Sequence, residues 1–285
     1  MSDGPFHRGE LLAQARTGSV GRGAAIRTAM PDQHRTFFQQ LPFVVVASVD
    51  AGWPVATLWT GAPGFVTSPD PTTLGLAVVR PPGDPASRAF VPGAPFGLLG
   101  IEPATRRRNR ANGAITSADP AGVVVAIHQS FGNCPQYIQP RALATAAAAA
   151  DATERLAALD PEAVHTITST DTLFVATAAL TGEPSGGVDV SHRGGPPGFV
   201  HVDRDVLTIP DYRGNRYFNT LGNLVVEPRA ALVFVDFARG DLLEVQGTTE
   251  IQWDGPEVDA LEGADRLWRV RLERAWRRRA AYRFG

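Results

Sequence analysis

The sequence predicts a mainly β protein with short helices, built as two small barrels in tandem. Roughly six short apolar runs per 100 residues, separated by Gly, Pro and Asp, have the spacing of strands in small barrels rather than in a parallel α/β sheet. The chain has 285 residues, of which 44% are hydrophobic and 20% charged, so it can bury one large core or two ordinary ones. An internal repeat favours two separate cores.

The repeat is a constant offset of 134 residues between two segments. TLWTGAPGFV at 57–66 and SHRGGPPGFV at 191–200 share a Gly, a Pro, a Gly, a Phe and a Val, and Gly113 falls on Gly247 at the same offset. Other blocks keep one order in both halves, the last of them at an offset of 145, which indicates an internal duplication. The paired blocks are 43–49 with 173–179, 57–66 with 191–200, 97–102 with 231–236, and 123–131 with 268–276.

The duplication divides the chain into four parts. They are a helical lead at 1–41, a first barrel at 42–140, an alanine-rich helical linker at 141–170 and a second barrel at 171–285. Helix patterns and the proline at 228 predict three short helices, since proline disfavours a helical residue before it. These helices are 31–41, 142–159 and 216–227.

Strand signals fill the rest of each repeat. Gly240-Asp241 lies between two apolar runs and predicts a hairpin. Trp268, Val270 and Leu272 alternate with charged residues, which predicts a strand with one apolar and one charged face.

The charge composition excludes several functions. All 27 basic residues are arginines, so neither a Schiff-base lysine nor a P-loop lysine exists. The formal net charge of −2 provides no basic field for nucleic acid. Arginine remains as a phosphate ligand, because its planar fork matches pairs of phosphate oxygens.

Cysteine and histidine usage argues against disulfides and metals. Cys134 is the one cysteine, and none of the six histidines has a Cys or a second His at ligand spacing. The longest uncharged alanine tract, 142–150, is too short to span a bilayer, and the N-terminus has no signal layout. We therefore expect a cytoplasmic protein without a metal or a membrane partner.

A polar cluster precedes the Gly/Pro turn of the second repeat. Ser191 and His192 are adjacent on a predicted strand and face opposite ways, and no G-x-S-x-G elbow is present, so a hydrolase triad is not expected. Arg193 is separated from Asn215 and Arg216 by a single predicted hairpin, which could bring them together around a phosphate. The alternative is that Arg193 and Arg216 are ordinary surface arginines, whose side chains are usually solvated.

The second repeat resembles the FMN-binding split-barrel family of pyridoxamine 5'-phosphate oxidase, in its branch of predicted flavin-nucleotide-binding proteins. The residues that carry the resemblance are Ser191-His192-Arg193, Leu207-Thr208-Ile209-Pro210, Gly214-Asn215-Arg216 and Glu227-Pro228-Arg229-Ala230-Ala231. It extends to 105–113 and 128–141 in the first repeat. The resemblance implies two tandem split β-barrels that form an intrachain pseudo-dimer.

The resemblance also implies a composite FMN site between the barrels. The second repeat would supply Ser191, His192, Arg193, Gly194, Ile209, Pro210, Asn215 and Arg216. The first repeat would supply Gln129, Ser130 and Asn133, with Arg107 or Arg108 at the pyrimidine edge of the flavin, where a cation stabilises the reduced ring. At the matching places of the first repeat stand Thr57, Leu58 and Trp59, so a second phosphate site is not expected.

Three functions follow from this resemblance. The first is an FMN-dependent oxidoreductase that passes electrons from a donor such as NAD(P)H to oxygen or a small organic acceptor. The second is a non-catalytic flavin-binding or electron-transfer module. The third keeps the barrel and binds haem or a deazaflavin. A homodimer of the two-repeat chain stays open, and the C-terminal AWRRRAAYRFG lacks the oxidase's substrate-binding Arg-Leu-His pattern.

Overall fold

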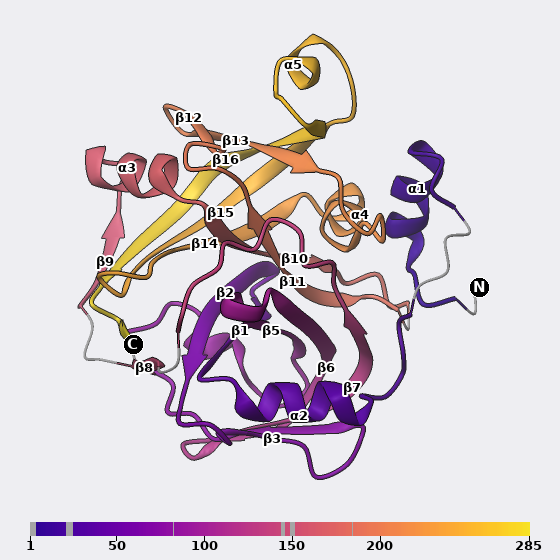
Figure 1. Cartoon of the computed structure of the whole chain (residues 1–285), viewed down its shortest axis with the longest axis vertical. Coiled ribbons are helices and arrows are strands. Elements are labelled where there is room, and N and C mark those ends of the chain that lie inside the picture. The colour runs from indigo at the N-terminus through magenta and orange to yellow at the C-terminus, as the bar shows by residue number, and fades with distance from the viewer. Residues whose placement is uncertain (1–3, 21–24, 82, 144–145, 149–151, 184) are drawn as a thin grey trace.

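The computed structural model describes the chain except residues 1–3, 21–24, 82, 144–145, 149–151 and 184, and it shows two β-barrels packed against each other (Figure 1). The first barrel, indigo to magenta, contains β1 (Phe43–Asp50), β2 (Trp53–Thr60), β3 (Val66–Thr67), β4 (Thr73–Leu76), β5 (Pro95–Glu102), β6 (Arg107–Asp119) and β7 (Gly122–Gly132). The second, orange to yellow, contains β10 (Thr172–Ala179), β11 (Gly187–Gly194), β12 (His201–Asp203), β13 (Val206–Tyr212), β14 (Arg229–Asp236), β15 (Asp241–Gln252) and β16 (Ala264–Arg279).

Short helices and small strands complete the described chain. They are α1 (Arg8–Arg16), α2 (Asp32–Gln40), η1 (Ser87–Ala89), η2 (Pro103–Thr105), β8 (Ala146–Ala148), β9 (Ala152–Leu156), α3 (Pro161–Ser169), α4 (Asn219–Val226), α5 (Pro256–Asp259) and β17 (Tyr282–Phe284). No helix among the described residues is long and apolar enough to cross a membrane.

The two sheets have the same strand order. The first runs β2-β1-β5-β6-β7-β4-β3 and the second β11-β10-β14-β15-β16-β13-β12, with antiparallel neighbours throughout. Strand for strand, the chain therefore contains one architecture twice. Two tandem split barrels that form an intrachain pseudo-dimer, as the resemblance implied, are confirmed.

The register of the strands follows the sequence offset. Leu99 pairs with Arg110 in the first sheet, and Val233 pairs with Glu244 in the second, both at an offset of 134. Both sheets have a register shift at the matching glycines, Gly113 and Gly247. A Cβ on Gly113 would lie 1.8 Å from the Ala126 carbonyl oxygen, so the backbone of the neighbouring strand requires a glycine there.

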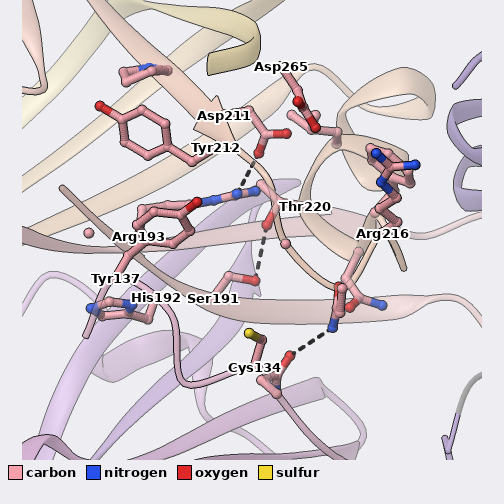
Figure 2. Close-up of a pocket in the computed structure, with 18 of the residues that line it drawn as sticks. Cys134, Tyr137, Ser191, His192, Arg193, Asp211, Tyr212, Arg216, Thr220 and Asp265 are labelled. Atoms are coloured by element: carbon pink, nitrogen blue, oxygen red, sulfur yellow. Dashed lines mark hydrogen bonds and ion pairs between the residues drawn. The ribbon is translucent and has the colours of Figure 1, made fainter. Parts of the chain in front are cut away.

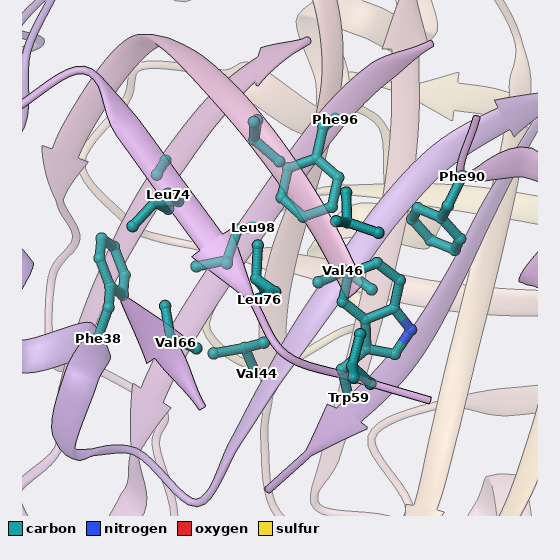
Figure 3. Packing of buried hydrophobic residues seen from close by; sticks show 14 of the residues in the cluster. Phe38, Val44, Val46, Trp59, Val66, Leu74, Leu76, Phe90, Phe96 and Leu98 are labelled. Atoms are coloured by element: carbon teal, nitrogen blue, oxygen red, sulfur yellow. The ribbon is translucent and has the colours of Figure 1, made fainter. Parts of the chain in front are cut away.

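Each barrel has its own core, and a third cluster joins them. Val44 and Val46 point into the first barrel with Trp59 (Figure 3), whereas the alternating Val45 faces the second barrel and packs in a cluster with Phe174. A sheet that is apolar on both faces explains the continuous apolar run at 43–47. This shared cluster fixes the two halves relative to each other.

The helix expected at 142–159 is wrong for the part of it that the structure describes. Strand β8 pairs with β17, and β9 pairs with the C-terminal part of β16, beyond the part that pairs with β13; residues 144–145 and 149–151 lie outside the described residues. Alanine has a high helix propensity, but pairing with a strand distant in sequence outweighs it here. In the expected linker at 141–170, only α3 is helical among the described residues.

The other two expected helices are present with shorter bounds. Helix α2 lies within the expected 31–41. Helix α4 begins at Asn219 rather than at 216, because Arg216 and Phe218 have left-handed backbone angles, with φ of 61° and 62°. The delayed start leaves residues 213–218 as a loop beside the candidate site.

Candidate functional site

A pocket rich in arginine lies between the two barrels (Figure 2). The second barrel contributes β11, the end of β13, the loop before α4 and the start of β16; the first contributes β6 and the segment after β7. We call it the arginine pocket after its five guanidinium groups, those of Arg108, Arg110, Arg193, Arg216 and Arg266.

Strand β11 aims two side chains into the arginine pocket. Because side chains alternate along a strand, Ser191 and Arg193 share one face (Figure 2). The Ser191 hydroxyl lies 2.5 Å from Arg110 Nη2, which donates to it, and 3.0 Å from Thr220 Oγ1. Ser191 therefore joins an arginine of the first barrel to helix α4 of the second.

The loop before α4 carries Asn215 and Arg216. The side-chain oxygen of Asn215 accepts from the backbone N–H of Tyr217 (3.1 Å), and its amide donates to Asn133 Oδ1 of the first barrel (3.4 Å). Helix α1 holds the loop from outside, where Gln14 Nε2 donates to the Tyr217 carbonyl at 3.2 Å. Non-glycine residues with positive φ cost about 1–3 kcal/mol each, and such strain is typical of ligand-binding loops.

Carboxylates neutralise three of the five arginines. Arg193 and Arg266 share Asp211, at 2.5 and 2.7 Å, and Arg266 also lies 3.4 Å from Asp265. Arg110 pairs with Asp189 at 2.9 Å. Within the described part of the chain, neither Arg108 nor Arg216 forms an ion pair with a carboxylate. The pocket therefore contains two positive charges that an anion could neutralise.

The hydrogen bond from Arg108 determines which ring nitrogen of His192 carries the proton. Arg108 Nη1 can only donate, so the Nδ1 of His192, 2.8 Å away, accepts and the proton of the neutral ring lies on Nε2. Burial, and then Arg108 and Arg193, lower the pKa of His192 well below its ordinary value. Burial and the neighbouring Arg110 and Arg193 also lower the pKa of Arg108 to about 10, which leaves it cationic at neutral pH.

Several buried N–H groups around the arginine pocket lack a hydrogen-bond partner among the described residues. They are Arg108 Nε, Arg110 Nε, Asn133 Nδ2, His192 Nε2, Arg193 Nε and Arg266 Nε. A buried donor without a partner costs about 1–3 kcal/mol. Six donors left unsatisfied around one pocket fit a ligand that carries many acceptor oxygens, such as a phosphate ester.

A buried polar network connects the arginine pocket to helix α1. Asp189 accepts from Arg110 (2.9 Å), Asn112 (2.7 Å) and Asn223 (3.0 Å). Asn223 Oδ1 lies 2.7 Å from His7 Nε2, and His7 Nδ1 accepts from the Gly9 N–H, so Nε2 is the donor. The N-terminal cap of α1 is thus part of the same hydrogen-bond network as Arg110.

Glu10 should make the stability of this network depend on pH. Burial, reinforced by Asp189, raises the pKa of Glu10 from the ordinary 4.5 to about 8, although Asn219, Arg110 and the His7 N–H favour its charged form. Between these pH values the folded chain holds a proton that the unfolded chain releases. The contribution of Glu10 to stability is therefore complete below about pH 4.5 and is lost as the pH rises toward 8, by up to about 1.4 kcal/mol per pH unit.

Urea unfolding across this pH range measures the effect. Glu10→Gln mimics the protonated carboxyl and should flatten the decline, whereas Glu262→Gln, at an exposed position, should leave it unchanged. A slope that persists in Glu10→Gln would assign the titration to another group.

The arginine pocket collects most of the site residues predicted from the sequence. Those that line it are Arg108, Asn133, Ser191, His192, Arg193, Gly194, Pro210, Asn215 and Arg216. The sequence arguments missed Arg110, Asp211, Thr220 and Arg266. Arg110 lies in the same RRRNR run as Arg108, and the alternation of β6 would have placed the two on one face.

The structure places four predicted residues away from the pocket. Gln129 Nε2 donates to the Pro5 carbonyl at 3.0 Å beside α1, and Ser130 is fully buried, 2.8 Å from His34 Nδ1. Arg107 points to the opposite face of β6 and stacks on the Phe37 ring. Ile209 packs in the core of the second barrel. The expected flavin contacts of the Gln-Ser pair are therefore not part of this pocket.

Comparison with known proteins gives one family. The family model for pyridoxamine 5'-phosphate oxidase matches residues 159–280, which include the second barrel strands and α3. No curated protein matches the chain.

Solved structures align with a single barrel's length of this chain. A putative pyridoxamine 5'-phosphate oxidase from Lactobacillus delbrueckii is 18% identical, covering 42% of this chain and 97% of its own (TM-score 0.33). A FAD-binding protein from Mesorhizobium loti is 14% identical, covering 46% and 98% (TM-score 0.32). HutZ, a heme storage protein from Vibrio cholerae, is 14% identical, covering 42% and 93% (TM-score 0.31).

Proposed function

Because residues 159–280 belong to the pyridoxamine 5'-phosphate oxidase family, we propose that the chain binds FMN with its phosphate in the arginine pocket. The observation that carries the proposal is the set of unpartnered buried donors around two arginines without carboxylate partners among the described residues. The pocket, about 110 Å³, has room for a phosphate group rather than for a whole flavin. The proposal therefore assigns only the phosphate to it.

Each part of the pocket has a role in this proposal. Arg108 and Arg216 supply the charge, while Asn133 and the loop residue Asn215 supply neutral donors. Arg193 and Arg266, both paired with Asp211, form one wall of the pocket. Tyr137 and Tyr212 stack at 5.2 Å at the border of the pocket, an apolar surface suitable for a flat ring.

The activity that this site supports best is oxidoreduction. Bound FMN would supply hydride and electron transfer between a reduced donor such as NAD(P)H and oxygen or a small organic acceptor. The chain itself would bind the phosphate, orient the cofactor and surround it with positive charge. A non-catalytic electron-transfer module would use the same site.

Titration with FMN and riboflavin tests the phosphate assignment. We expect one FMN per chain, because Thr57 and Trp59 stand in the first barrel where Ser191 and Arg193 stand in the second. Riboflavin, which lacks the phosphate, should bind at least about tenfold more weakly, since each charge-assisted bond contributes about 1.5–3 kcal/mol.

The visible spectrum and anaerobic mixing separate the alternatives. A protein that takes up no FMN, or binds riboflavin equally well, would contradict the proposal, and uptake of haem or a deazaflavin in place of FMN would replace its cofactor. Bleaching of the bound flavin by NADH or NADPH supports the enzyme. Bound flavin that only a chemical reductant bleaches identifies an electron-transfer module.

A further inference from the structure

A second cavity, of about 670 Å³, lies at another part of the junction between the barrels. Strand β2 and the 83–88 loop of the first barrel line it together with β9, β15 and β16 of the second half. Its volume falls within the range of about 300–1,000 Å³ that is typical of small-molecule sites. Among the described residues, none lines both this cavity and the arginine pocket, and the FMN proposal makes no use of it.

The duplication shows what is different at this place. Strand pairing matches Gln246 and Arg274 of the second barrel with Asn112 and Gln129 of the first. The N-terminal segment covers the pair in the first barrel, where Gln129 Nε2 donates to the Pro5 carbonyl at 3.0 Å. Over Gln246 and Arg274, the described residues leave the second cavity instead.

Four side chains of the second cavity lie on one face of the second sheet. Gln246 on β15 is directly opposite Arg274 on β16, and Trp276 on β16 is directly opposite Arg155 on β9. Arg274 and Trp276 are two residues apart on one strand, so their side chains point to the same side. Arg155 and Arg274 are therefore diagonal neighbours, whose long side chains can reach one common group.

The two arginines of this face have no carboxylate partner. Arg155 is exposed, Arg274 is half-buried, and neither forms an ion pair within the described ranges. Arg274 lies over the Trp53 ring, 5.0 Å from its centroid. An organic carboxylate at the opening would meet both guanidinium groups.

Gln246 adds an independent sign of a ligand. Its Nε2 donates to the Pro54 carbonyl at 2.8 Å, which fixes the orientation of the amide. The Oε1 atom is buried and has no hydrogen-bond partner among the described residues, and the side chain, 5% exposed, borders the second cavity. A single neutral acceptor of this kind matches a hydroxyl, which has one donor, better than an ammonium group, which has three.

The acidic side chains at the floor already have partners within the protein. Asp84 and Glu244 lie 2.9 and 3.6 Å from Arg278 Nη1, and Asp84 also accepts from Thr57 Oγ1 at 2.6 Å. Any negative charge on these two groups disfavours a doubly charged phosphate in the cavity more than a singly charged carboxylate. The ligand contacts therefore fall on the arginines at the opening and on Gln246.

We propose that the second cavity binds a small α-hydroxycarboxylate with an apolar side chain. Its carboxylate lies between Arg155 and Arg274, its hydroxyl donates to Gln246 Oε1, and its side chain packs along the Trp276 ring. In such a compound the hydroxyl and the carboxylate are on adjacent carbons, which matches the directly opposite positions of Gln246 and Arg274. The site depends neither on a flavin nor on the arginine pocket.

Calorimetric titration of the full chain with lactate, hydroxyisocaproate and phenyllactate, each at up to millimolar concentration, tests the proposal. We expect phenyllactate to bind most tightly, because its ring covers the largest part of Trp276. Phenyllactamide, which lacks the charge, should bind at least about tenfold more weakly than phenyllactate. Phenylpropionate, which lacks the hydroxyl, should bind at least about threefold more weakly.

Two variants assign the two contacts separately. Arg274→Ala should weaken phenyllactate and phenylpropionate alike, by about tenfold or more, because both carry the carboxylate. Gln246→Leu should weaken phenyllactate alone and remove its advantage over phenylpropionate. Arg271→Ala removes an equal charge from the same strand, at an exposed position outside the second cavity, and should leave both affinities within about threefold of the parent.

The remaining controls keep the two sites distinct. Arg216→Ala, in the arginine pocket, should leave phenyllactate binding unchanged, so a failure of the FMN proposal would not affect this result. Should Gln246→Leu unfold, Arg274→Ala and the amide comparison still decide, because the Arg274 side chain is partly exposed. The proposal is overturned if none of the three hydroxycarboxylates binds more tightly than its amide and its deoxy acid, if phenylalanine or inorganic phosphate binds more tightly than phenyllactate, or if Arg274→Ala binds as tightly as the parent chain.

Discussion

Replacing Asp189 with alanine should lower the free energy of unfolding by about 3–5 kcal/mol, the usual cost of breaking a buried ion pair. Asp189 is 8% exposed and its carboxylate accepts hydrogen bonds from Arg110, Asn112 and Asn223. Its removal leaves the Arg110 guanidinium, 3% exposed, without its carboxylate partner. Urea denaturation measures the loss.

An exposed ion pair provides the matched control. Asp205 lies 3.3 Å from Arg271, and both side chains are more than half exposed, so Asp205→Ala should cost at most about 1 kcal/mol. Equal effects of the two substitutions would show that burial does not govern the Asp189 pair. A large loss confined to Asp189→Ala would identify the network as a main link between the barrels, since Arg110 and Asp189 belong to different halves.

The barrels could be predicted from the sequence because their signals are local. The Gly/Pro turns recur at one offset, and Gly113 and Gly247 mark the same register shift in both sheets, where a side chain would collide with the next strand. Backbone requirements of this kind limit the residue type at single positions. They therefore survive in a duplication whose other residues have diverged.

The linker could not be predicted in the same way. Strand β9 forms because Arg155 and its neighbours pair with Trp276 and its neighbours on β16. That partner is more than 100 residues away in the sequence, while the alanines between the barrels have a high intrinsic helix propensity. Pairing of this kind, with a strand distant in sequence, leaves no periodic signal in the segment itself.

The candidate site, too, could be predicted from the sequence only in part. The cluster around Arg193 and the loop of Arg216 could be predicted, because each is a short continuous motif. The pairing of Arg193 and Arg266 with Asp211 could not, since it depends on the register of β13 against β16. That pairing changes the expected phosphate ligands: Arg193 already has a carboxylate, so the free positive charge lies on Arg108 and Arg216.

Arg216→Ala should weaken FMN binding by about tenfold to a hundredfold. Arg216 forms no ion pair with a carboxylate in the described residues, and a charge-assisted bond to a phosphate contributes about 1.5–3 kcal/mol. Riboflavin affinity should change little, because riboflavin has no phosphate for the guanidinium to bind. Fluorescence titration with both flavins measures the two constants on one preparation.

Two matched variants separate a lost ligand from a lost fold. Arg213→Ala removes an equal charge three residues away, at an exposed position that does not line the arginine pocket, and should leave FMN affinity within about threefold of the parent. Trp59→Ala should instead lower stability by about 3–5 kcal/mol, since this ring, which packs against Phe90 at 4.6 Å, leaves a large cavity. If Arg216→Ala and Arg213→Ala lower FMN affinity equally, the loss comes from the reduced positive charge of the protein and not from a direct contact between Arg216 and the phosphate. The phosphate would then lie outside the arginine pocket. The inference that the second barrel holds the phosphate would be wrong.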